Sequence, residues 1–92
     1  MKKIENDKFT IYEVEALYKQ FIIWCNEAKG ELSLDFEAVQ KIDMAGIQLL
    51  LSAQKSCREK SARLTLENVP ENILEALRIA GCEAYFFGGD HD

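Results

Sequence analysis

The feature that most constrains this chain is a repeated change of hydrophobic period along its length. Apolar and polar residues alternate in three short segments, 8–12, 31–36 and 63–66, and this period of two predicts half-buried strands. Between and after these segments, apolar residues recur every three or four positions, which predicts amphipathic helices. A chain that switches between the two periods is expected to fold as an α/β domain.

Each of three predicted helices is bounded by residues that favour helix ends. Glycine is typical just after a helix, aspartate is a preferred N-cap, and proline is tolerated in the first turn. The predicted helices are 14–28, followed by Gly30; 43–60, beginning at Asp43; and 71–80, between Pro70 and Gly81.

A short closing strand is expected at Ala84–Phe87, so that strands and helices alternate along the chain. Parallel strands that follow one another need right-handed crossovers, which the helices supply. Sheets covered on both faces usually read as continuous apolar runs, whereas these strands alternate. We therefore expect an α/β fold with a four- to five-stranded mixed, largely parallel sheet and helices mostly on one face.

Length and charge limit the classes of partner. The chain has 92 residues and a net charge of −5, which allows one hydrophobic core and disfavours nucleic acid and anionic membrane surfaces. We expect a single domain with its core at about 8–87 and a flexible tail at 88–92. The sequence has neither a secretory signal pattern nor an apolar run long enough to span a membrane, so a cytoplasmic protein with a neutral or basic protein partner is expected.

The residues that usually carry catalysis or bind metals are sparse. Cys25, Cys57 and Cys82 form no C-x-x-C pair and are interpreted as core-filling residues, with a redox-sensing thiol as the alternative. His91 is the only histidine, and chelation of a metal by residues 90–92 would require ordering of the tail. We expect no catalytic residue, metal or cofactor.

Residues 32–53 carry the pattern L-S-L-D-F-E-A-V-Q-K-I-D-M-A-G-I-Q-L-L-L-S-A, an apolar strand that leads to Asp, a glycine and an apolar helix. This pattern resembles the STAS family (sulfate transporter and anti-sigma factor antagonist). The resemblance extends to the strand at 62–66, the segment N-V-P-E-N-I-L-E-A-L-R-I-A-G at 68–81 and the aromatic segment Tyr85–Phe87, and covers roughly 9–87. It implies a domain that acts by binding a partner protein.

The same resemblance implies a phosphoacceptor, because in the family a hydroxyl residue directly after the Asp is phosphorylated by a cognate kinase. Met44 occupies that position here and Ala45 follows it, so neither side chain can be phosphorylated. A flexible methionine instead offers an adaptable apolar contact. We expect a binding surface that is not switched at the usual site.

The resemblance places the partner-binding surface at the start of the second predicted helix. Leu49 lies round the helical wheel from the sheet-facing residues and is expected to be exposed. Asp43 has a purely structural alternative as an N-cap, and Gly46 has one in close packing. On the first helix, Ile23 and Trp24 are candidates for a second surface, through which two copies of the chain would associate as a homodimer. The partner-binding candidates are Asp43, Met44, Ala45, Gly46, Gln48, Leu49 and Ser52.

The function expected from this resemblance is a non-enzymatic regulatory module, similar to anti-sigma factor antagonists and to STAS proteins of chemotaxis-type signalling. Its partner would be an anti-sigma or histidine-kinase-like ATPase, or a signalling complex. The alternative is an accessory subunit that binds the ATPase of an ABC-type lipid transport system. A third possibility is a scaffold or sensor that binds a nucleotide or lipid, to which no residue points.

Overall fold

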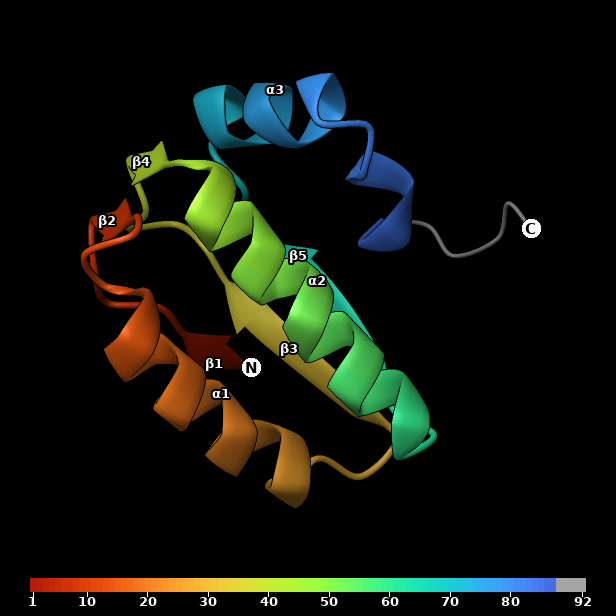
Figure 1. Cartoon of the computed structure of the whole chain (residues 1–92). Coiled ribbons are helices and arrows are strands. Elements are labelled where there is room, and N and C mark those ends of the chain that lie inside the picture. The colour runs from red at the N-terminus through yellow and green to blue at the C-terminus, as the bar shows by residue number, and fades with distance from the viewer. Residues whose placement is uncertain (88–92) are drawn as a thin grey trace.

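The computed structural model describes residues 1–87, and Figure 1 shows the order of their elements. The elements are β1 (Lys2–Lys3), β2 (Lys8–Phe9), α1 (Val14–Glu27), β3 (Glu31–Asp35), β4 (Lys41–Ile42), α2 (Met44–Glu59), β5 (Arg63–Glu67), α3 (Glu71–Ile79) and a 3₁₀ helix, η1 (Glu83–Tyr85). The three long helices and the strands β3 and β5 confirm the predicted segments to within a few residues.

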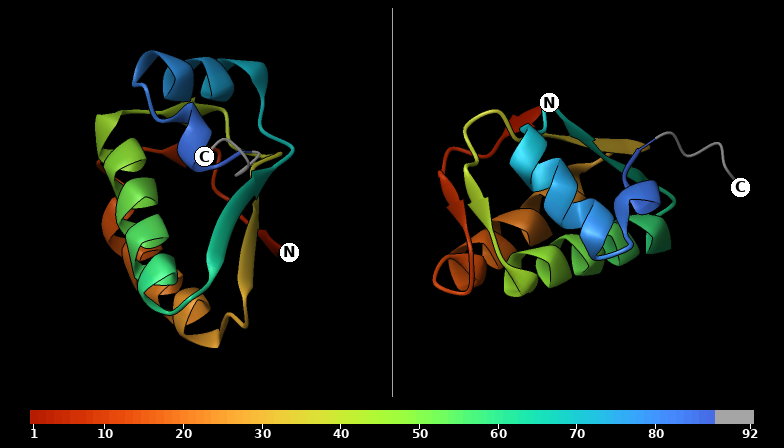
Figure 2. Two further views of the ribbon diagram at one scale, coloured as in Figure 1. Left: turned by 90° about the vertical axis from the view of Figure 1, so that its right-hand side faces the viewer. Right: turned by 90° about the horizontal axis from the view of Figure 1, so that it is seen from above.

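The main sheet has the order β1-β3-β5, and both strand pairs are parallel. Leu32 pairs with Leu64 and Leu34 with Leu66, and all four side chains are buried. α1 and α2 lie side by side on one face of this sheet (Figure 2). The predicted α/β class, the parallel pairing and the helices on one face are confirmed.

Two very short strands form a second parallel sheet, in which Lys8 pairs with Lys41 and Phe9 with Ile42. A two-residue strand is too short to show a hydrophobic period, so neither β4 nor β1 was predicted. The β2–β4 pair joins the segment before α1 to the segment before α2, which are more than 30 residues apart in sequence. It therefore positions the first turns of both helices.

The predicted strand at 8–12 is wrong beyond Phe9. Thr10 donates hydrogen bonds from its backbone nitrogen and its Oγ1 to Glu13 Oε1, at 2.9 and 2.6 Å. This is half of a capping box, in which a Thr and a Glu three residues later close the first turn of a helix. The chain therefore turns at residue 10, and the alternation of Ile11 with its neighbours has no pleat to follow.

The predicted closing strand at Ala84–Phe87 is also wrong. The backbone nitrogen of Tyr85 donates to Cys82 O and that of Phe86 donates to Glu83 O, both at 3.1 Å. These local bonds occupy donors that a strand would offer to its neighbour, so the segment forms η1. Phe86 nevertheless reaches the core and is buried.

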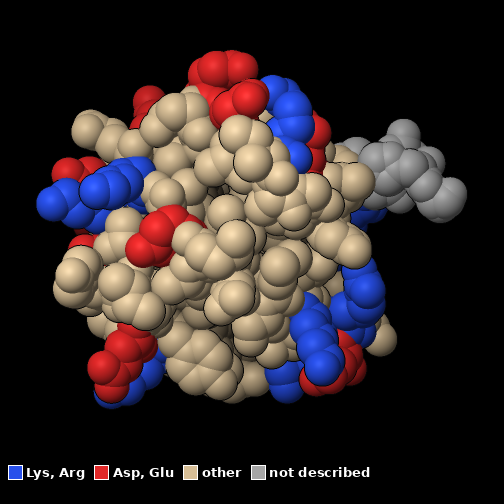
Figure 3. Space-filling view, turned by 45° about the horizontal axis from the view of Figure 1, so that its top comes forward, with Lys and Arg blue, Asp and Glu red and all other residues tan. Residues whose placement is uncertain are grey.

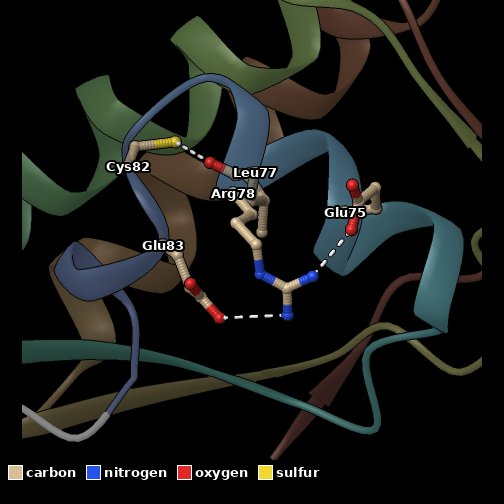
Figure 4. A network of polar contacts seen from close by, with 5 residues as sticks. All are labelled: Glu75, Leu77, Arg78, Cys82 and Glu83. Carbon is tan, nitrogen blue, oxygen red and sulfur yellow. Dashed lines mark hydrogen bonds and ion pairs between the residues drawn. The ribbon is translucent and has the colours of Figure 1, made fainter.

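A network of polar contacts connects α3 to η1 (Figure 4). Arg78 contacts Glu75 Oε1 at 2.6 Å through Nη1 and Glu83 Oε2 at 3.6 Å through Nη2. In the same segment, Cys82 Sγ donates to Leu77 O at 3.6 Å. Ion pairs this exposed contribute little to stability, so burial of Cys82 and Phe86 is the main anchor of this end.

The core is one cluster of buried side chains drawn from all the major elements. Phe9 lies at its centre, in edge-to-face contact with Phe36 at 5.4 Å between ring centroids. The three cysteines are free and buried, as expected of residues that fill the core. Ile4 is buried too, so the core begins before residue 8.

Among residues 1–87, no helix has both the length and the apolar character that crossing a bilayer requires.

The turn between α2 and β5 holds Ser61 in a left-handed conformation, with φ of 58°. Glycine adopts this conformation without the steric cost of a Cβ atom. We expect Ser61→Gly to raise the free energy of unfolding by about 0.5–1 kcal/mol, measured by urea denaturation. Ser61→Ala is the matched control, because it removes the hydroxyl but keeps Cβ, and a gain in that variant would contradict the explanation.

Candidate functional site

The site is organised by the carboxylate of Asp43, the N-cap of α2. Asp43 Oδ1 accepts a hydrogen bond from the backbone nitrogen of Gly46, and Oδ2 accepts one from the backbone nitrogen of Ile11, both at 3.0 Å. The first bond confirms the predicted N-cap. The second, across 32 residues, binds the segment before α1 to the start of α2, so the carboxylate also shapes the surface.

The same contacts set the charge state of Asp43. Partial burial acts to raise the pKa of this carboxyl, but the backbone N–H groups that point at it, led by those of Ile11 and Gly46, outweigh burial and lower the pKa below its ordinary value of 3.8. A carboxyl with a lowered pKa in the folded state stabilises the fold above its unfolded pKa, and this contribution is lost as the pH falls through the folded pKa.

This linkage gives a testable pH dependence. We expect Asp43→Asn to cost about 1 kcal/mol at neutral pH, because the amide can accept only one of the two bonds. The difference from the native chain should shrink as the pH falls below 3.8, where Asp43 itself becomes protonated. Urea denaturation of both proteins across the acid range measures it, and a difference that stays constant with pH would contradict the assignment.

Gly46 lies in the first turn of α2, directly against β2. A Cβ atom at this position would be 2.1 Å from the carbonyl oxygen of Phe9 and 2.9 Å from Ile42 Cγ1. No side chain fits in that space, so the structural alternative for Gly46, close packing, is confirmed. This close approach keeps the first turn of α2 against β2 and β4.

Three exposed apolar side chains belong to the two segments that the bond from Ile11 to Asp43 joins. Met44, the first residue of α2, is 59% exposed, and Ile11 and Tyr12 are 59% and 91% exposed. Asp43 directly precedes Met44, and its carboxylate accepts the hydrogen bond from Ile11. The segment that carries Ile11 and Tyr12 therefore lies beside the segment that carries Met44. We call Ile11, Tyr12 and Met44 the helix-start surface.

A groove between α1 and α2 continues from the helix-start surface. It has a volume of about 390 Å³ and is lined by Ile11, Val14, Glu15, Tyr18, Ala45, Gln48, Leu49 and Ser52. α2 carries no charged residue from Met44 to Gln54. The face in Figure 3 accordingly has a broad uncharged area, with charged side chains mostly near its margins.

Leu49 is only 7% exposed, so the prediction that it is exposed is wrong. The helical wheel took the sheet as the only neighbour of α2, but α1 packs against the adjacent side of the helix. Leu49 therefore lies between the two helices and forms the floor of the groove. It can touch a bound partner only through that floor.

The other partner-binding candidates lie together. Gln48 and Ser52 are exposed on the groove side of α2, and Ala45 is half-buried above Leu49. Sequence reasoning missed Ile11 and Tyr18 on the opposite wall of the groove, and the exposed Tyr12 beside Ile11. The T-x-x-E pattern at residues 10–13 could have revealed the turn that exposes Ile11 and Tyr12.

The second surface considered on α1 is divided by burial. Ile23 is exposed, whereas Trp24 is half-buried and stacks on Phe21 with 5.6 Å between ring centroids.

Within residues 1–87, no three metal-ligating side chains of His, Cys, Asp or Glu come together. The possible chelating group at residues 90–92 lies outside the described residues.

Comparison with known proteins places this geometry in context. A family model described as "Mlab, STAS domain" matches residues 7–87. The crystal structure of a sulfate transporter family protein from Wolinella succinogenes is similar, with a TM-score of 0.74 and 25% sequence identity over 87% of this chain. The match covers 64% of that solved chain, so this chain spans less than two thirds of its length. No curated protein matches the sequence.

Proposed function

The chain belongs to the STAS family, in the group described as "Mlab, STAS domain", and on that premise we propose that it is a regulatory module that binds one partner protein through the helix-start surface and the adjoining groove. STAS domains act in general as interaction modules rather than enzymes. The observation that carries the proposal is the exposure of Met44 at the first position of α2, directly after Asp43, whose carboxylate binds the segment that exposes Ile11 and Tyr12. Apolar side chains grouped in this way are typical of protein interfaces.

The residue directly after Asp43 has no hydroxyl group, and this bears on regulation. The position at which the family resemblance implies a phosphoacceptor holds Met44, and Ala45 follows. A phosphate at the start of a helix would add about −1.5 to −2 charges to the interface and oppose docking on an apolar partner. With methionine there, phosphorylation at this position cannot switch the surface, and we propose that control comes from the amount or state of the partner.

The electrostatics narrow the partner further. The groove has uncharged walls apart from Glu15, and the whole chain carries a net charge of −5. A partner surface with an apolar centre and a neutral or basic rim would complement both features. An ATPase of the anti-sigma or histidine-kinase-like class is the partner that we propose first.

The alternative partner is the ATPase of an ABC-type lipid transport system. The observation that favours it is the description of the matching family model as "Mlab, STAS domain". Both alternatives use the same surface, so the identity of the captured ATPase separates them. Genes that neighbour this one give a quick first indication: a permease and an ATPase favour transport, and sigma-regulatory or chemotaxis genes favour signalling.

Site-specific crosslinking tests the proposal. A photo-reactive phenylalanine derivative replaces Met44 in one protein and Ile79, which is 77% exposed on α3, in the control. We expect light-dependent capture of an ATPase from cells at position 44 and not at position 79. Equal capture at both positions, or adducts only between two copies of this chain, would overturn the assignment of the surface.

A further inference from the structure

Two of the three buried cysteines touch each other. Cys25, near the end of α1, and Cys57, near the end of α2, have their sulfur atoms 3.4 Å apart. Both side chains are almost completely enclosed. The third, Cys82, is also buried, but its sulfur donates to the carbonyl oxygen of Leu77 on α3. The structure therefore holds one thiol pair and one separate thiol in comparable burial.

We propose that Cys25 and Cys57 are a site of oxidation by hydroperoxides, and that the oxidation forms a disulfide that links α1 to α2 beneath the groove. A disulfide requires a sulfur–sulfur distance of about 2.05 Å, so the two sulfurs must approach by little more than 1 Å, about what a change of side-chain torsion provides. Neither cysteine lies on the helix-start surface, and this inference goes beyond the proposed function.

The chemistry balances with one molecule of hydrogen peroxide. The sulfur of one cysteine attacks a peroxide oxygen, the O–O bond breaks, and a sulfenic acid and one water are formed. The second thiol then attacks the sulfenic sulfur and displaces a second water, so the two thiol protons end in water and two electrons pass to the peroxide.

The surroundings of the two thiols slow this reaction in the closed structure. Burial and the contact with Cys25 raise the pKa of the Cys57 thiol to about 12, and only thiolates react quickly with peroxides. A small cavity between α1 and α2, about 10 Å³ and lined by Cys25, Leu49 and Ser52 among others, lies on the route from the groove to the pair. Oxidation thus requires the two helices to open slightly, and it is expected to accelerate with pH.

The experiment uses the complete native chain. The protein is treated with hydrogen peroxide at about pH 8, unfolded, alkylated and digested with trypsin, which places the three cysteines in separate peptides, 20–29, 56–58 and 79–92. We expect a mass loss of about 2 Da before alkylation, a linked pair of peptides 20–29 and 56–58, and alkylated Cys82 as the internal control for a buried single thiol.

Thermal unfolding provides a second readout. Cys25 and Cys57 are 32 residues apart in sequence. A disulfide that closes a loop of this length is expected to raise Tm by on the order of 10 °C, and reduction with dithiothreitol should reverse the increase. Cys25→Ala and Cys57→Ala should both lack the linked peptides and the shift in Tm, whereas Cys82→Ala should keep them. Alkylation of all three cysteines after peroxide treatment, or links that involve Cys82 as often as the pair, would overturn the proposal. Partner binding is not measured, so these outcomes are independent of the proposed function.

Discussion

Replacement of Gly46 by alanine is expected to lower the free energy of unfolding by about 3 kcal/mol or more. In an isolated helix the same substitution would stabilise by about 1 kcal/mol, because alanine has the higher helix propensity. The added Cβ would lie 2.1 Å from the Phe9 carbonyl oxygen. That atom belongs to the backbone of β2, so either the β2–β4 pair or the first turn of α2 must move. The cost of that movement exceeds the gain in helix propensity, so the free energy of unfolding falls.

Gly30→Ala is the matched control for this prediction. A Cβ atom at Gly30 would meet no atom within 4 Å, although φ is +92°, so only the backbone conformation is penalised, by about 1–2 kcal/mol. Urea denaturation of the two variants and the native chain measures both effects. A Gly46→Ala protein as stable as the Gly30→Ala protein would mean that β2 does not hold α2 by this contact.

Met44→Asp is expected to weaken partner binding by about 10- to 100-fold while the fold is retained. The new carboxylate would have to lose its water in an apolar interface and would find no partner there. Its position at the first residue of α2 favours the fold, since a negative charge interacts well with the N-terminus of a helix. Loss of binding with unchanged stability therefore separates the role of this side chain in docking from any role in folding.

Ile79→Asp is the control for that prediction. Ile79 is a large exposed apolar residue like Met44, but it lies at the end of α3. Titration calorimetry with the ATPase captured by crosslinking should show native affinity for Ile79→Asp and reduced affinity for Met44→Asp. Equal affinities for the two variants would move the interface away from the helix-start surface.

The helices show how much of the fold was readable in advance. Their periods of three and four residues, with Asp43 at one start and Gly30 after one end, predicted α1 and α2 to within a few residues. These signals are local, because each depends on residues within one or two turns. The two-residue strands carry no such signal, and their positions follow from pairing with distant segments.

The candidate site divides in the same way. Sequence alone determined that no hydroxyl follows Asp43, that α2 begins at an apolar residue, and that an α/β order of elements positions this helix on a sheet. Only the tertiary structure decided which side chains remain accessible: α1 covers Leu49, while the bond from Ile11 to Asp43 brings Ile11 and Tyr12 beside Met44. The physical reason is that exposure depends on what packs against a residue, and the neighbours that decide it here, α1 and Ile11, belong to a part of the chain distant in sequence from α2.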